Sequence, residues 1–291
     1  MRRLLRKICI YLPDIIVMQI DNLRTYGRLL NLKKPKYYGE KIQWIKAKGN
    51  LERYKNIVDK YLVREYIKNA IGEEYLPKLI AVYNKENEID YSILPEKFVL
   101  KLNDGSDRII ICRDKASLDI EKTNKRLRKL LKEDYYKYTK EHQYKGIKKK
   151  IICEEYLEDK SGDLVEYALH CFSGKVKLIE VHTNRSTNYR EDYFEVDWTK
   201  IPMKGKAENS LKPIEKPKFL DKLIYLGEIL AKDFEYIRVD FNAVDERLYF
   251  SELTLTPANG TDKFNPLEYD LKIAGLINLE NYNKPFNFKE V

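Results

Sequence analysis

Two runs of alternating residues in the C-terminal part of the chain predict a β-hairpin. Residues 236–244 and 248–254 alternate between apolar and polar side chains in the way that strands do. The three charged residues between them, 245–247, suit a turn. A loop of these three residues would pair Val244 with Leu248, the first position on each side of the turn.

The predicted hairpin places four polar side chains on one face. Counting outward from the turn, Asp240 falls opposite Glu252, and Arg238 falls opposite Thr254. Successive side chains of a strand alternate between faces, so all four share a face. Like charges directly opposite one another are destabilising, and a hard cation such as Mg²⁺ would compensate the two carboxylates. An exposed hairpin with solvated charges is the alternative.

The rest of the pattern alternates helices with strands that return as hairpins. Helical spacing of apolar residues predicts helices over residues 59–70, 117–143 and 219–232. Apolar runs predict strands over residues 79–83, 98–103, 108–113, 151–157, 164–172 and 175–181. Residues 182–217 contain three prolines and predict a loop-rich segment. This mixture favours an α+β chain built on antiparallel sheets.

Composition narrows the classes of partner. The chain has 291 residues and a net charge of +9, which favours an anionic partner such as a nucleotide or an acidic polysaccharide. It has none of the usual nucleic-acid-binding motifs, so nucleic acid is not expected. Its four cysteines lie far apart and it has three histidines, so the sequence does not predict a zinc site.

The N-terminus is basic and then apolar. Pro13 interrupts the apolar stretch well before the roughly 20 residues that a transmembrane helix needs. No small-residue cleavage site follows, so a signal peptide is not expected. We therefore expect a cytoplasmic protein. The N-terminus would either contact the inner face of the membrane peripherally or form an ordinary packed helix.

Several separate segments resemble one branch of a known enzyme family. They are residues 32–46, 59–68, 71–77, 98–103 and 110–115, together with the hairpin strands that carry Arg-x-Asp at 238–240 and Glu-x-Thr at 252–254. In this order they resemble the TupA-like branch of the ATP-grasp family, which is associated with teichuronopeptide and other cell-surface polysaccharides. The resemblance covers roughly residues 30–275.

The resemblance implies an α+β ATP-grasp fold, in which two α+β subdomains with antiparallel sheets grip a nucleotide between them. We expect a basic helical N-terminal region over residues 1–56. A first ATP-grasp subdomain would follow over residues 57–153, and a second, with the metal-binding hairpin, over residues 154–291.

The resemblance also implies where ATP would bind. Lys101 and Lys60 match the lysines that contact the phosphates, and Ser106 lies in the loop that would cover them. The segment from Glu154 and Glu155 to Leu157 matches the hinge that reads the adenine edge. Asp163 would accept hydrogen bonds from the ribose, with Glu158 as the alternative.

Two further sets of residues are implied by the same resemblance. Mg²⁺ would be held by Asp240, Glu252 and Thr254, although the family usually has Asn at the last position. Arg238 would neutralise the metal carboxylates or stabilise a developing oxyanion, and Arg185 would contact the γ-phosphate or the substrate. The phosphate loop departs from the family, because Asp104 and Asp107 stand where His and Gly are usual.

The implied activity is an ATP-dependent carboxylate–amine ligase of cell-surface polysaccharide biosynthesis. ATP would convert a uronic acid or similar carboxylate to an acyl phosphate, which an amino compound would then attack. The expected partners are ATP, Mg²⁺, an acidic glycan or lipid-linked sugar precursor, and the amine. The alternatives are a sugar kinase or phosphotransferase, a glycosyltransferase-like biosynthesis protein and a catalytically idle binding protein.

Overall fold

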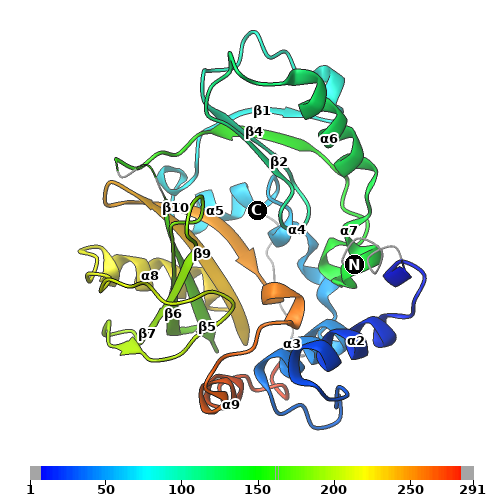
Figure 1. Ribbon diagram of the computed structural model, residues 1–291, viewed down its shortest axis with the longest axis vertical. Coiled ribbons are helices and arrows are strands. Elements are labelled where there is room, and N and C mark those ends of the chain that lie inside the picture. Colours follow the sequence, from blue (N-terminus) through cyan, green and yellow to red (C-terminus); the bar gives the residue numbers. More distant parts are fainter. Residues whose placement is uncertain (1–7, 161, 163, 283–291) are drawn as a thin grey trace.

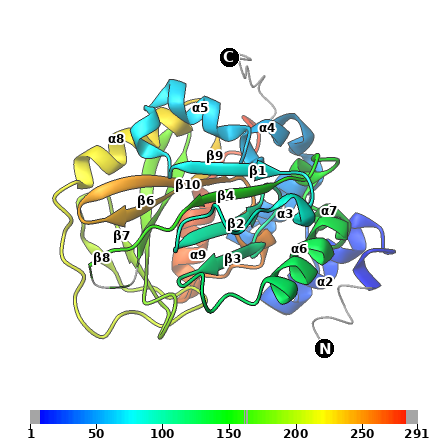
Figure 2. The same cartoon turned by 90° about the horizontal axis from the view of Figure 1, so that it is seen from above.

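Two antiparallel sheets dominate the chain. The computed structural model describes residues 8–160, 162 and 164–282. Figure 1 shows the smaller sheet above the larger one, with helices α2 and α3 beside and below them. The view from above places the smaller sheet across the larger one (Figure 2).

The smaller sheet has four strands in the order β1-β4-β2-β3. Their bounds are β1 Leu79–Tyr83, β2 Phe98–Leu102, β3 Ile109–Cys112 and β4 Ile151–Glu155. Along β2, the side chains of Phe98, Leu100 and Leu102 are buried against a core that includes Leu127 of helix α6. Strand alternation therefore turns Lys101 to the opposite face.

The larger sheet has six strands in the order β10-β9-β5-β6-β7-β8. Their bounds are β5 Val165–Phe172, β6 Lys175–Thr183, β7 Arg190–Phe194, β8 Lys200–Ile201, β9 Tyr236–Val244 and β10 Arg247–Thr254. Strands β7 and β8 lie in the segment predicted to be loop-rich, so that prediction was wrong for residues 190–194 and 200–201. The predicted hairpins β5–β6 and β9–β10 are present.

One face of the larger sheet is apolar and packs against helix α8, Leu220–Ala231. Leu169, Ile179 and Val239 lie in this core. Gly227 permits the close approach of helix and sheet, since a Cβ atom there would lie 2.4 Å from Leu169 Cδ1. The other face of the sheet is left for polar side chains.

The remaining helices surround the sheets. Their bounds are α2 Asp14–Tyr26, α3 Tyr38–Lys48, α4 Lys55–Val58, α5 Val63–Ala70, α6 Ile120–Lys132, α7 Tyr135–Thr139 and α9 Leu267–Gly275. Helices α3, α4 and α5 share the core of the larger sheet, whereas the core of the smaller sheet lies within residues 89–153. The division of the chain at residues 57 and 154 stays a prediction. Among the described helices, none combines the length and the apolar content needed to cross a membrane.

The β9–β10 hairpin confirms the predicted pairing of Asp240 with Glu252 and of Arg238 with Thr254. The prediction was wrong at the turn, where Val244 pairs with Arg247 and not with Leu248. The turn therefore has two residues, both with positive φ, as two-residue hairpin turns of type I′ require. A bulge between Phe250 and Glu252 adds one residue to β10 and restores the predicted register.

Candidate functional site

A cavity of about 440 Å³ lies between the two sheets. The smaller sheet and its β2–β3 loop form one wall, and the polar face of the larger sheet forms the other. Six of the predicted site residues line it: Lys60, Lys101, Ser106, Arg185, Arg238 and Glu252. The structure thus brings together residues that are up to 192 positions apart, from Lys60 to Glu252.

Cross-strand pairing arranges the polar face of the larger sheet in rows. The first row contains Glu252, Asp240, Ala168, Glu180 and Tyr193, on β10, β9, β5, β6 and β7. The second row contains Asn242, Glu166, His182 and Glu191, on β9, β5, β6 and β7. A single sheet register therefore places many ionisable groups against one cavity.

The predicted metal carboxylates are compensated by cations of the chain. Arg238 donates from Nε and Nη2 to the two Asp240 oxygens, at 2.8 and 2.6 Å. The same Nη2 lies 3.8 Å from Glu252 Oε1, and Lys60 Nζ lies 3.5 Å from Glu252 Oε2. Thr254 donates its hydroxyl to Glu252 Oε1 at 3.0 Å. The sequence predicted a bound cation and Arg238 as the compensating charges; in the structure Arg238 and Lys60 lie next to the two carboxylates.

Burial and these cations act in opposite directions on the two carboxyl groups. Burial raises the pKa of Asp240, and the adjacent Arg238 offsets only part of that rise. Burial also acts to raise the pKa of Glu252, but Lys60 and Arg238 outweigh it and the pKa is lowered. Glu252 therefore stays ionised at neutral pH with a cation on either side.

Lys101 pairs with Glu154 and not with Glu252. Its ammonium lies 2.5 Å from Glu154 Oε2, on the neighbouring strand β4. Glu154 Oε1 also accepts from Arg64 Nη1 at 2.9 Å, so this buried carboxylate has two cationic partners. It is Lys60, not Lys101, that reaches Glu252.

Asn103 fixes the entrance to the phosphate loop. Its side-chain amide donates to Asp59 Oδ2 at 2.7 Å and to the Lys148 carbonyl, and its oxygen accepts from the Lys150 amide. Asp59 Oδ1 accepts the backbone N–H groups of residues 61 and 62, which forms a turn and delays the start of the predicted 59–70 helix to residue 63. Lys60 Nζ, anchored beside them, donates to the Gly105 carbonyl at 2.7 Å.

The two acidic departures in the phosphate loop have different surroundings. Asp104 is buried and lies 3.3 Å from Arg108 Nε, so a cation of the same loop faces it. Asp107 lines the cavity and adopts a left-handed conformation, with φ 60°. Glycine adopts that conformation without strain, which explains why the family pattern favours Gly at this position.

None of the predicted hinge residues Glu154, Glu155 and Leu157 is among the residues that line this cavity. Glu155 pairs with the main chain of Lys78, accepting its N–H through the side chain at 2.7 Å and donating its own N–H to the carbonyl at 3.0 Å. It lines a separate hollow of about 760 Å³. Leu157 follows the end of β4 and is half-buried. Asp163 lies outside the described residues.

Comparison with protein families identifies the chain. Residues 40–278 match the family described as TupA-like ATPgrasp. The chain belongs to the TupA-like ATP-grasp family. The predicted family and its α+β ATP-grasp fold are confirmed. Comparison of this TupA-like ATP-grasp protein with curated proteins gave no significant match.

Among solved structures, this TupA-like ATP-grasp protein is similar to D-alanine–D-alanine ligase from Bacillus anthracis in complex with ATP. The identity is 16%, the TM-score is 0.42, and the match covers 69% of this chain and 54% of the ligase. For the D-alanine–D-alanine ligase from Helicobacter pylori the identity is 15% and the TM-score is 0.41, and the match covers 76% of this chain and 61% of the ligase. For the ATP-grasp ligase PsnB in complex with minimal precursor, Mg and ADP the identity is 12% and the TM-score is 0.39, and the match covers 75% of this chain and 58% of PsnB. The chain thus spans less than two thirds of the length of each.

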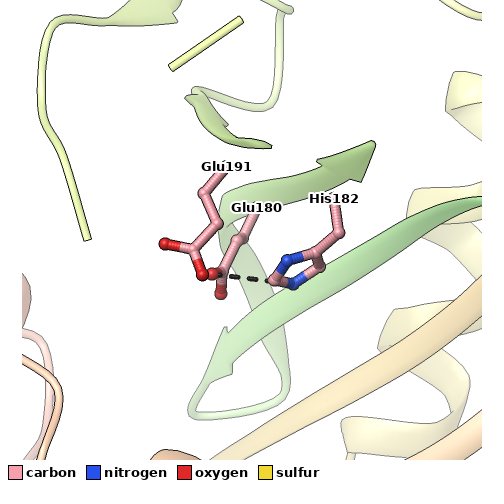
Figure 3. A group of neighbouring side chains, drawn as sticks. All are labelled: Glu180, His182 and Glu191. Carbon is pink, nitrogen blue, oxygen red and sulfur yellow. Dashed lines mark ion pairs between the residues drawn. The ribbon is translucent and has the colours of Figure 1, made fainter. Parts of the chain in front are cut away.

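The sequence argument missed a buried group at the far end of the cavity of this TupA-like ATP-grasp protein. Glu180, His182 and Glu191 have ligand atoms within 4.8 Å of one another (Figure 3). Burial lowers the pKa of His182 to about 4, although the nearby Glu180 opposes the shift. The available signal was the polar alternation of Glu180 and His182 near the end of strand β6.

Arg185 lies next to this group. It donates from Nη2 to Glu166 Oε1, and its guanidinium lies 5.6 Å from the centre of the Tyr189 ring. Burial raises the pKa of Glu166 to about 7, and Arg185 offsets part of that rise. Arg185 lines the cavity, and its contact with the γ-phosphate or the substrate stays a prediction.

Proposed function

We propose that this protein is an ATP-dependent carboxylate–amine ligase that forms ADP and phosphate. The observation that carries the proposal is the cavity itself, which is lined by Lys60 and Lys101 on one wall and by Glu252 and Arg238 on the other. Cations that would bind phosphates and a carboxylate that would bind a metal therefore line one site. Membership of the ATP-grasp family supports the same reaction class.

Within the proposed site, Lys60, Lys101 and the loop around Ser106 would hold the phosphates. Asp240, Glu252 and Thr254 would hold Mg²⁺, and their oxygen atoms are the donors that this ion prefers. The set fits the ion, because each Asp240 oxygen keeps a second lone pair beside its contact with Arg238. When bound, Mg²⁺ would neutralise charge on the phosphates.

The residues of the chain would act by position and charge. A substrate carboxylate oxygen attacks the γ-phosphorus, the bond to the bridging oxygen breaks, and ADP leaves. The amine nitrogen then attacks the acyl carbon, and phosphate and a proton are released. Lys60, Lys101 and Arg238 would stabilise the negative charge that moves between oxygen atoms. The route requires no covalent nucleophile from the protein.

The substrates are proposed from the family resemblance and from charge. The carboxylate would belong to an acidic glycan or its lipid-linked precursor in cell-surface polysaccharide biosynthesis, and the amine to an amino compound. The net charge of +9 supports attraction of an acidic partner, with an association rate that falls as salt rises. We place the reaction in the cytoplasm, with the N-terminus as a peripheral membrane contact.

Isotope transfer tests the proposal. The protein is incubated with ATP, Mg²⁺, mixed amino acids and a uronic-acid glycan carrying oxygen-18 in its carboxylates. We expect ADP, an amide, and phosphate that carries one label. Phosphate retained on a sugar hydroxyl would establish the kinase, and AMP with pyrophosphate would rule out both reactions. Calorimetry with ATP and with sugar nucleotides separates a glycosyltransferase from the ligase, and ATP binding without ADP release would identify an idle binding protein.

A further inference from the structure

The Glu180–His182–Glu191 group contains a buried nitrogen that lacks a hydrogen-bond partner. His182 is 4% exposed, and its Nε2 is unpaired within the described residues. The neighbouring acceptors are Glu180 Oε1 at 3.6 Å and Glu166 Oε1 at 3.7 Å, both beyond hydrogen-bond distance. Figure 3 shows the imidazole directed at the carboxylate of Glu180.

The hydrogen bonds around the ring determine what Nε2 carries. Tyr189 donates its single hydroxyl proton to Glu191 Oε1 at 2.6 Å. The Tyr189 oxygen therefore accepts from His182 Nδ1, which lies 2.6 Å away. With its proton on Nδ1, the neutral ring presents a lone pair at Nε2. This lone pair faces Glu180 Oε1, which is an acceptor when its carboxyl group is ionised.

The two carboxylates of the group are oriented by tyrosine, histidine and backbone donors. Glu191 Oε2 accepts the backbone N–H groups of residues 206 and 207 at 2.8 and 3.0 Å. Glu180 is held by Tyr193, 3.2 Å from Oε1, and by His170 Nε2, 3.1 Å from Oε2. In contrast, Glu166 is paired with Arg185. The contacts recorded for Glu180 and Glu191 thus fix their positions and leave two negative charges facing a nitrogen lone pair.

We infer that Glu180, His182 and Glu191 form a binding site for a divalent transition-metal ion of the Zn²⁺ class. An imidazole nitrogen with two carboxylate oxygens suits such an ion better than Mg²⁺, which prefers oxygen ligands alone. The charge of the ion would balance the two carboxylates. Three protein ligands would leave a position open to the cavity, where a substrate atom would complete the coordination.

The spacing of the three ligands supports a site that tightens around an ion. Bonds from zinc to nitrogen or oxygen are about 2.0–2.2 Å, so two ligand atoms of a tetrahedral ion lie roughly 3.4 Å apart. The ligand atoms here lie within 4.8 Å. The contact from His182 Nδ1 to Tyr189 is the second-shell hydrogen bond that metal-binding histidines usually make. Composition alone did not predict this site, because it uses one histidine and no cysteine.

Zinc binding to the full-length protein tests the inference independently of any ligase activity. We expect equilibrium dialysis in the presence of millimolar Mg²⁺ to find one equivalent of bound Zn²⁺. His182→Gln should weaken binding about 100-fold or more, since loss of an outer-shell partner already costs roughly 10–100-fold. Tyr189→Phe, which keeps all three ligands, should weaken it within that range. Co²⁺ should give a visible absorption band that His182→Gln removes.

A second histidine provides the matched control. His142 lies between Asp14 and Glu52, at 2.8 and 3.5 Å, outside the cavity and partly exposed. His142→Gln should bind Zn²⁺ as the unmodified protein does. The inference is overturned if the unmodified protein binds no Zn²⁺, if His182→Gln binds it equally well, or if His142→Gln is the variant that loses it. Thermal unfolding of each variant identifies a misfolded protein. If His182→Gln is misfolded, the Zn²⁺ affinity of Tyr189→Phe decides the outcome.

Discussion

Two pairs of carboxylates on the same sheet face are compensated in different ways. Asp240 and Glu252 are in contact with full positive charges, from Arg238 and Lys60. Glu180 and Glu191 are held mainly by tyrosine hydroxyls and backbone N–H groups. In the first row of the sheet, Ala168 lies between Asp240 and Glu180 and separates the two pairs by a small side chain.

The difference shows what a buried carboxylate requires. An ionised group needs both charge compensation and hydrogen bonds when it leaves water. The first pair obtains both from the chain, so it is stable before any ligand binds. The second obtains hydrogen bonds but no ion pair with a lysine or arginine of the described residues, although Arg238 acts on Glu180 from farther away. It is therefore the better candidate for an ion that the chain does not supply. The predictions below test this contrast.

The largest expected effect is on turnover, from Glu252→Gln. Loss of this charge removes a proposed Mg²⁺ ligand that stabilises the transition state by several kcal/mol, so kcat/KM for ATP should fall at least about 1000-fold. Steady-state ADP release measures it. The control is Glu228→Gln on α8, where the glutamate lies on the other side of the sheet beside Lys175. Equal loss in both variants would contradict the assignment.

The next effect is on stability, from Arg238→Ala. It leaves the Asp240 carboxylate, which is 1% exposed, without its bidentate partner, so the free energy of unfolding should fall by about 3–5 kcal/mol. Denaturant unfolding measures it. The double variant Arg238→Ala/Asp240→Ala should recover part of the loss. Arg185→Ala, at a partly exposed pair, should cost less than about 1 kcal/mol. Similar losses for both arginines would mean that the compensation is not specific.

Lys101→Ala should separate nucleotide binding from stability. Glu154 keeps its contact with Arg64, so the melting temperature should change little. The loss of a charged contact to phosphate should raise the Kd for ATP by roughly 10–100-fold. Scanning calorimetry measures the melting temperature, and titration calorimetry measures the Kd for ATP. The control is Lys97→Ala, at an exposed ion pair just before β2. A loss of stability as large as the loss of affinity would make Lys101 structural.

The smallest effect concerns Asp107, an acid on the phosphate side of the cavity. Asp107→Gly removes a negative charge and relieves the left-handed conformation, while glycine raises the entropy of the unfolded chain. Stability should therefore change by less than about 1 kcal/mol, and ATP affinity should rise severalfold. Asp107→Asn removes the charge alone. If Asn does not reproduce the gain, the cause is conformation and not charge.

The sequence predicted those parts of the molecule that depend on residues close together along the chain. The pairing of Asp240 with Glu252 lies within one hairpin, and alternation found it because the bulge in β10 offsets the one-residue error in the predicted turn. The partner of Lys101 was not predictable in this way, because β2 and β4 are far apart in the sequence and become neighbours only when the sheet assembles. There Glu154 pairs with Val99, which shares a face with Lys101.

The group around His182 was missed for a related reason. Strand β7, Arg190–Phe194, begins with three charged residues in succession, and so lacks the alternation that marks a strand. Its Glu191 meets His182 only after β7 pairs with β6. The roles of the remaining predicted site residues, including Ser106, Glu155, Leu157 and Asp163, stay predictions.

The bulge at Ser251 has a consequence for engineering the protein. The turn is one residue shorter than the alternation predicts, and the bulge adds that residue back to β10. The pairing of Asp240 with Glu252 is therefore set by the bulge as well as by the turn. The hydrogen bonds and ion pairs of Asp245 and Glu246, at the tip of the hairpin, are with exposed groups. A short peptide tag or fluorophore loop inserted between these two residues would thus project away from the cavity, and Glu252 would keep its place opposite Asp240.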